Sequence, residues 1–177
     1  MKRLFFIFLI SINFISCASV LRQDLAGQSV YNFTLTDVAQ NPGFYQGKTL
    51  MFGGVIAKTT LTKEGSLIEA LYVAVDSRGY HQGIDNSAGR FLAIFPGSAK
   101  ILDPMIFQEK REVTIAGEYI GTRKGMIDEI EYTYPLFKIV ELYLWEEVKE
   151  DYYRYPRHRF EMGYPWHYGY GLWWEDR

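Results

Sequence analysis

The sequence predicts an all-β fold: a small closed or partly open Greek-key barrel of about five strands, with a small β-sandwich as the alternative. Helical periodicity is scarce, and about five short apolar runs are separated by turns rich in glycine. Glycines also stand inside the apolar runs, where the strands of a small barrel must bend sharply. The chain has 177 residues, enough for one domain with flanking segments.

A short helical turn is expected before the first strand. It covers residues 36–40, is capped by Asp37 and ends at Asn41-Pro42-Gly43. The first strand then covers 48–58 and contains the pair Gly53-Gly54, which suits a bulge or a tight bend.

The middle of the chain predicts three more strands. A turn over 63–65 leads into a strand over 66–76, whose apolar residues share one face. The polar residues 77–89 predict a loop, which is followed by a short strand over 90–95. A fourth strand is expected over 112–121.

The last predicted strand covers 136–145, a dense apolar and aromatic run. Residues 122–134 before it are expected to form a loop that Pro135 closes. Together the predicted strands indicate an OB-like barrel domain that covers residues 32–150.

The N-terminus has the three parts of a secretory signal peptide over residues 1–16. A basic start at Lys2 and Arg3 precedes an apolar run over 4–12 and a short processing zone. The apolar run is shorter than the roughly 20 residues that a membrane-spanning helix needs. The segment therefore predicts export and cleavage.

Phe14-Ile15-Ser16-Cys17 resembles the lipobox of bacterial lipoproteins, and Cys17 is the chain's single cysteine. The resemblance implies cleavage before Cys17 and acylation of that residue, with two or three acyl chains that make a lasting membrane anchor. Ala18 stands at the position that influences sorting, and it is not the aspartate associated with inner-membrane retention. The expected location is therefore the outer membrane, with the polar residues 17–31 as a lipidated tether.

Several segments, in order, resemble the Slp-type family of outer-membrane lipoproteins, which has members associated with starvation. The resemblance covers roughly residues 17–145 and implies an envelope lipoprotein without established catalytic residues. The segments that carry it are Asn41-Pro42-Gly43-Phe44-Tyr45-Gln46-Gly47-Lys48, Phe52-Gly53-Gly54-Val55-Ile56, Gly89-Arg90-Phe91-Leu92, Leu102-Asp103-Pro104, Val113-Thr114-Ile115-Ala116-Gly117 and Tyr132-Thr133-Tyr134-Pro135.

Catalytic and metal sites are not expected. The one nearby hydrolase-like set is Ser77 and His81 with Asp76 or Asp85, and no nucleophile-elbow pattern accompanies it, so solvated loop residues are the better interpretation. The chain's three histidines lack the close ligand spacing of zinc sites, and no cofactor is expected. A loop with three carboxylates also contains Arg and Lys and is interpreted as merely charged: Asp128, Glu129 and Glu131.

The C-terminal tail over 151–177 is crowded with aromatic residues, interleaved with glycine, proline and arginine and without a regular period. It is interpreted as a flexible tail, as a strap on the barrel, or as an adhesive segment that stacks on sugars or lies at a membrane interface. Trp166, Trp173 and Trp174 are the candidate stacking residues. A net charge of -2 gives no general attraction for nucleic acid.

Together these features predict a non-catalytic, outer-membrane-anchored envelope lipoprotein with a structural or binding role. Its expected partners are membrane lipid, through the acylated Cys17, and an envelope protein or glycan. The alternative is a carbohydrate- or peptidoglycan-binding module that uses a barrel face and the aromatic tail.

Overall fold

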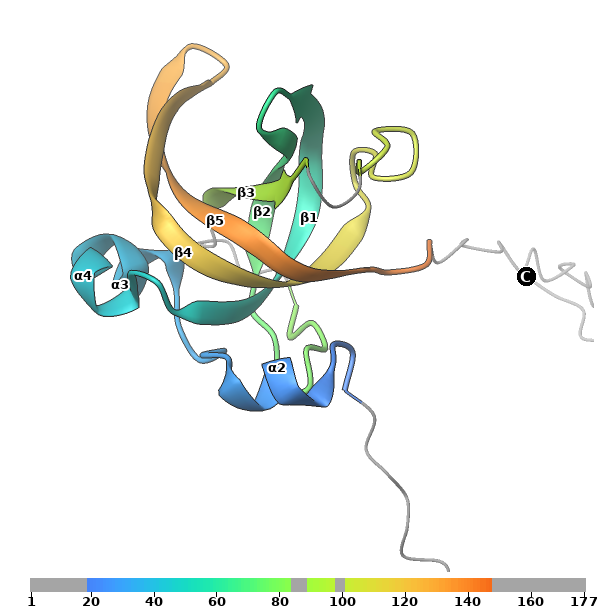
Figure 1. The fold of residues 1–177 in the computed structure, drawn as a ribbon. Helices are drawn as coiled ribbons and strands as arrows, with labels where there is room; N and C mark the ends of the chain where they lie inside the picture. The colour runs from blue at the N-terminus through green and yellow to red at the C-terminus, as the bar shows by residue number, and fades with distance from the viewer. Residues whose placement is uncertain (1–18, 84–88, 98–100, 148–177) are drawn as a thin grey trace, which may run out of the picture. The chain divides into compact units, whose positions relative to one another are not determined.

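Five strands close into a barrel in the computed structural model, which describes residues 19–83, 89–97 and 101–147. The order around the barrel is β1-β2-β3-β5-β4 (Figure 1). Four of the five pairings are antiparallel, and the pairing between β3 and β5 is parallel. This arrangement is the OB-like Greek-key barrel that the sequence predicts, and the sandwich alternative is wrong. The strands are β1 (Thr49–Thr62), β2 (Gly65–Val73), β3 (Arg90–Pro96), β4 (Glu112–Ile127) and β5 (Ile130–Leu144).

Aromatic and aliphatic side chains from all five strands fill the barrel interior. Phe52 of β1 is fully buried, and its ring centroid lies 4.9 Å from that of Phe91 and 4.6 Å from that of Phe137. A Cβ on Gly54 would lie 2.8 Å from Cζ of Phe91. Glycine at position 54 therefore lets the Phe91 ring pack against the backbone of β1.

The glycine pair in β1 does not form the bulge that the sequence suggests. Gly53 and Gly54 pair in regular register with β2 on one side and β4 on the other. The irregularity of β1 falls between Ile56 and Lys58 instead. The two glycines serve close packing on the two faces of the strand, toward Phe91 inside the barrel and toward His81 on the other face.

The loop predicted over 122–134 is wrong, because β4 and β5 continue through it as one long hairpin. Ile127 pairs with Ile130, and Asp128 at the turn has a φ of 53°. Pro135 lies inside β5, opposite Thr122, and closes no loop. One face of the hairpin is exposed and mostly polar, so these residues lack the apolar alternation that identifies a strand in a sequence.

Within the described residues, three short helices accompany the barrel: α2 (Gln23–Gln28), α3 (Leu35–Gln40) and α4 (Pro42–Tyr45). The predicted helical turn is confirmed as α3, but its cap is Thr34 and not Asp37. The Thr34 hydroxyl oxygen accepts a hydrogen bond from the Asp37 N–H at 3.1 Å, and the Asp37 carboxylate accepts one from the Thr34 N–H at 2.8 Å. Asp37 is thus the reciprocal partner in a capping box.

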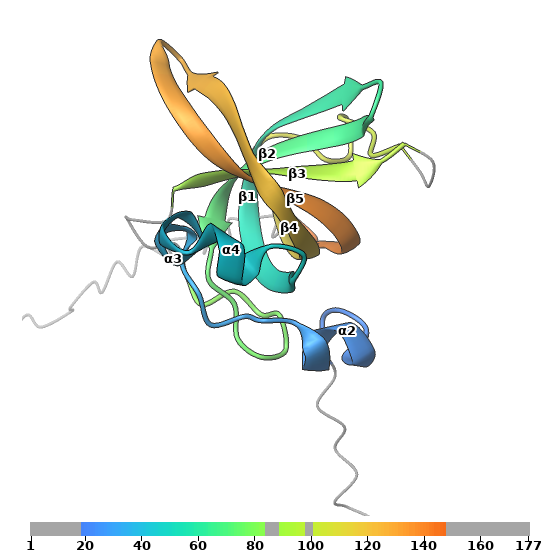
Figure 2. The same cartoon turned by 60° about the vertical axis from the view of Figure 1, so that its left-hand side comes forward.

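The tether expected over 17–31 is folded onto the barrel from residue 19 onward. Leu21 is 3% exposed, and together with Ala26 it packs in a cluster with Met51, Val75 and Ala116 of the barrel. A parallel bridge joins Val30 to Leu50 of β1. Burial of these apolar side chains against the barrel stabilises the segment. The segment has few apolar residues, so the sequence alone does not predict this packing. α2 lies at the opposite end of the barrel from the tip of the β4–β5 hairpin (Figures 1 and 2).

Over the residues that the structure describes, no helix is both long enough and apolar enough to cross a bilayer. The predicted tail over 151–177 lies outside the described residues.

Candidate functional site

The residues that the sequence singles out for lipidation, sorting and ligand stacking lie outside the described residues. They are Cys17, Ala18, Trp166, Trp173 and Trp174. The described part of the chain instead contains three surface features: a cluster of aromatic side chains around His81, a barrel face that the β4–β5 hairpin covers, and a shallow hollow on that hairpin.

Of the hydrolase-like set, Asp85 lies outside the described residues, and the described members Ser77, His81 and Asp76 are engaged separately. The Nδ1 atom of His81 lies 3.0 Å from a carboxylate oxygen of Glu112, and its Nε2 lies 3.0 Å from the Val113 carbonyl oxygen. Ser77 is exposed at the surface. The histidine is therefore fixed against β4 and is not poised beside the serine.

Asp76, the acid proposed for that set, stabilises its own turn. Its carboxylate accepts hydrogen bonds from the N–H groups of Arg78 and Tyr80 at 2.9 and 3.0 Å, and it pairs with the Arg78 guanidinium at 3.1 Å. Partial burial raises the pKa of Asp76, but these hydrogen bonds outweigh it and hold that pKa below its usual value.

An aromatic corner, formed by Tyr80, His81, Tyr143 and Trp145, surrounds this histidine. The Trp145 ring centroid lies 5.7 Å from Tyr80, 5.4 Å from His81 and 5.1 Å from Tyr143. Tyr80 and Tyr143 are 40% and 41% exposed, so the corner presents rings to solvent. A small open hollow of about 230 Å³ lies beside it, lined by Tyr80, His81, Glu112 and Trp145.

Buried Thr114 of β4 connects the two segments that form the corner. Its hydroxyl donates to the Gly79 carbonyl at 2.9 Å and accepts from the Trp145 indole N–H at 3.0 Å. The Nε2 atom of His81 lies 3.3 Å from the same oxygen. Residues 79–81 and 145 are distant in sequence, and no motif links them, so sequence reasoning missed this cluster.

The outer face of β2 and β3 is covered by the base of the β4–β5 hairpin. The Tyr134 hydroxyl donates to Glu69 at 3.1 Å, and the same carboxylate pairs with Arg90 at 2.7 Å. Tyr134 is 2% exposed and packs with Leu92 and Leu136. Burial, reinforced by Glu69, raises the pKa of Tyr134 to about 12. In OB folds this face and the neighbouring loops commonly bind oligonucleotides and oligosaccharides, and here the chain itself occupies part of it.

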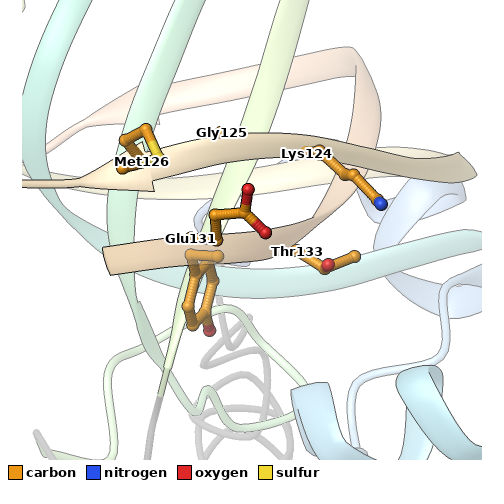
Figure 3. A pocket seen from close by; sticks show the side chains of 6 residues that line it. Lys124, Gly125, Met126, Glu131 and Thr133 are labelled. Atoms are coloured by element: carbon orange, nitrogen blue, oxygen red, sulfur yellow. The ribbon is translucent and has the colours of Figure 1, made fainter. Parts of the chain in front are cut away.

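A second hollow, of about 340 Å³, lies on the exposed face of the hairpin (Figure 3). Lys124 and Thr133 project from the paired strands beside Glu131, and all three side chains are exposed. The other carboxylates of the predicted charged loop, Asp128 and Glu129, lie at the exposed turn. Over the described ranges, no group of three or more His, Cys, Asp or Glu residues could hold a metal ion. Catalytic sites usually lie in enclosed pockets, whereas this hollow is open and its carboxylate is exposed to solvent.

Three known proteins resemble this chain in sequence or in structure. It is 27% identical to the outer membrane protein Slp of Escherichia coli over 173 residues, 95% of this chain and 85% of that protein. An uncharacterized protein of Haemophilus influenzae is 33% identical over 99 residues, which are 55% of this chain and about half (52%) of that relative. Among solved structures, the mitochondrial single-stranded DNA binding protein Rim1 of S. cerevisiae has a TM-score of 0.34 at 10% identity, covering 57% of this chain and 97% of that one.

The sequence model of the outer membrane lipoprotein Slp family matches residues 14–174, nearly the whole chain. This match agrees with the ordered segments on which the sequence resemblance rests. The protein therefore belongs to the outer membrane lipoprotein Slp family and is an outer-membrane protein of the bacterial envelope.

Proposed function

We propose that this protein is a non-catalytic lipoprotein with a structural role, whose barrel is held directly against the outer membrane by acyl chains on Cys17. The observation that carries the proposal is the start of the folded domain, only two residues after Cys17. Family membership supports the envelope location.

The first described residues are bound to the barrel. The Ser19 hydroxyl and the Val20 N–H both donate to the Arg78 carbonyl, at 3.1 and 2.8 Å, and Leu21 is buried. Two residues of extended chain span at most about 7 Å. If Cys17 is acylated, the barrel therefore lies close to the lipid surface. A lipoprotein with a long linker could instead hold its domain far from the membrane.

A non-catalytic role is supported by how the polar side chains are used. His81 is bonded to β4, Asp76 stabilises a turn, and Glu69 joins Arg90 and Tyr134 beneath the hairpin. These contacts bind the three side chains to neighbouring structural groups, which supports a structural use of each.

Acylation is tested by the intact mass of protein extracted from membranes, which is expected to begin at a lipid-modified Cys17. Cys17→Ser is expected to abolish processing and anchoring. Ala18→Asp keeps the anchor but is expected to shift the protein to the inner-membrane fraction. A mature form that starts elsewhere or lacks lipid contradicts the anchor, and an unchanged distribution of Ala18→Asp contradicts the sorting role.

Glycan binding has weaker support, because the hairpin covers part of the barrel face that such a module would use. The alternative then depends on the tail residues Trp166, Trp173 and Trp174. Chemical-shift changes on addition of peptidoglycan fragments, lost when Trp173 and Trp174 become alanine, would favour the binding module over the structural role.

A further inference from the structure

The aromatic corner lies beside the point where the chain enters the folded domain. We propose that Tyr80, Tyr143 and Trp145 of this corner, together with Arg78, insert into the headgroup region of the membrane that holds Cys17. This inference rests on the acylation proposed above and names the surface of the barrel that contacts lipid.

Hydrogen bonds and ring contacts connect Ser19 and Val20 to the aromatic corner. Ser19 and Val20 bind the Arg78 carbonyl, and a Cβ on Gly79 would lie 3.2 Å from Cβ of Val20. The Arg78 guanidinium lies 5.3 Å from the ring centroid of Tyr80, which in turn packs on Trp145. The 78–80 turn therefore touches the first described residues that follow Cys17.

The reach of the anchor restricts how the barrel can lie. Cys17 is two residues from Ser19, so its Cα lies within about 7 Å of the Cα of Ser19. Acyl chains on Cys17 enter the bilayer, so the lipid surface must pass close to Ser19 and to the 78–80 turn bound to it. The tip of the β4–β5 hairpin, at the other end of the barrel from α2, then points away from the membrane (Figures 1 and 2).

The chemistry of the corner suits a headgroup layer. Tyrosine and tryptophan are enriched at membrane–water interfaces, because their rings are apolar and their polar atoms remain hydrated. Two ion pairs balance charges in the surrounding surface, at Arg78–Asp76 and Arg22–Glu141. Because these charges are balanced, a zwitterionic lipid surface is sufficient and an anionic one is not required.

Depth-dependent quenching of tryptophan fluorescence tests the proposal on the full-length, lipidated protein. Trp166→Phe, Trp173→Phe and Trp174→Phe leave Trp145 as the single tryptophan of the chain. The protein is reconstituted into phosphatidylcholine vesicles with and without lipids brominated near the headgroup end of the acyl chain. The matched control adds Trp145→Phe and Ile130→Trp, which moves the reporter to the hairpin tip, where Ile130 is 71% exposed.

Brominated lipid is expected to reduce the emission of Trp145 about twofold or more and to leave the hairpin reporter nearly unchanged. Vesicle flotation without quenching of Trp145 overturns the inference and leaves the anchor intact. Failure to float, with an unmodified Cys17 by mass, overturns the proposed function and this inference with it. Quenching that appears only when residues 148–177 are removed shows that the tail covers the corner, and also overturns the inference.

Discussion

Gly53 is the position where adding one methyl group should disturb the aromatic corner most directly. A Cβ there would lie 2.6 Å from Nε2 of His81, 2.7 Å from its Cδ2 and 3.2 Å from Cβ of Val73. The backbone of Gly53 cannot retreat easily, because β1 is paired with β2 and β4 at this residue. In the variant Gly53→Ala, the imidazole must therefore leave its place.

The contacts of His81 set the size of the effect. Its ring nitrogens lie 3.0 Å from a Glu112 carboxylate oxygen and 3.0 Å from the Val113 carbonyl oxygen, and the ring packs on Trp145. One hydrogen bond from the imidazole, worth about 0.5–1.5 kcal/mol, and a ring contact of similar worth set the effect, so Gly53→Ala should lower the free energy of unfolding by about 1 to 3 kcal/mol. In Gly53→Ala the imidazole leaves its place and loses these contacts. His81→Ala removes the same contacts, so it should destabilise the protein by a similar amount.

A double-mutant cycle in urea unfolding, on the chain without residues 1–17, measures this coupling. Once His81 is alanine, Gly53→Ala should add less than about 1 kcal/mol. Gly43→Ala is the matched control, because a Cβ at that position in α4 meets nothing within 4 Å, and it should be neutral or slightly stabilising. Additive effects of Gly53→Ala and His81→Ala would refute the packing of the ring on β1.

Three further predictions concern the rest of the domain. Leu21→Ala should lower the free energy of unfolding by about 2–5 kcal/mol, because Leu21 is buried against the barrel, whereas an unchanged urea midpoint would restore the idea of a free tether. Thr34→Ala should cost about 0.5–2 kcal/mol through loss of the α3 cap, with Thr34→Ser close to wild type; equal loss in both variants would point to packing instead of capping. Burial raises the pKa of Tyr72 from 10.0 to about 12, so the folded state keeps a proton that the unfolded chain has lost, and stability present below pH 10 should fall as the pH rises toward 12. Tyr72→Phe should flatten that part of the stability–pH curve measured by urea unfolding, while lowering stability at pH 7 because the Phe33 carbonyl loses its buried hydroxyl donor; an unchanged slope would contradict the linkage.

The sequence by itself determined the fold class and most of the strands. Apolar runs of strand length, separated by polar residues, mark the inward-facing stretches around Phe52 and Phe91 because burial leaves a direct pattern in the residue types. The turn before β2 is also marked locally. Gly65 has a φ of 141°, a backbone conformation that favours glycine whatever its tertiary neighbours.

Only the tertiary structure decided the parts whose stability comes from distant partners. The segment 122–134 has few apolar residues on its exposed face. It forms a hairpin because Tyr134 and Ile127 pack in one apolar cluster with Leu92 and Leu67. The chain around Leu21 reads as polar, and its burial depends on a barrel surface that lies far away in sequence.

The aromatic corner combines residues whose elements the sequence predicts with contacts that only the tertiary structure shows. Tyr80 belongs to a predicted loop and Trp145 to the end of a predicted strand, and Thr114 brings them together through two hydrogen bonds. The lipobox at Cys17 is a linear signal that sequence alone can predict. Its proposed consequence for the barrel, a fixed face toward the membrane, depends on the contacts of Ser19 and Val20, because a linear motif contains no information on where the next residues pack.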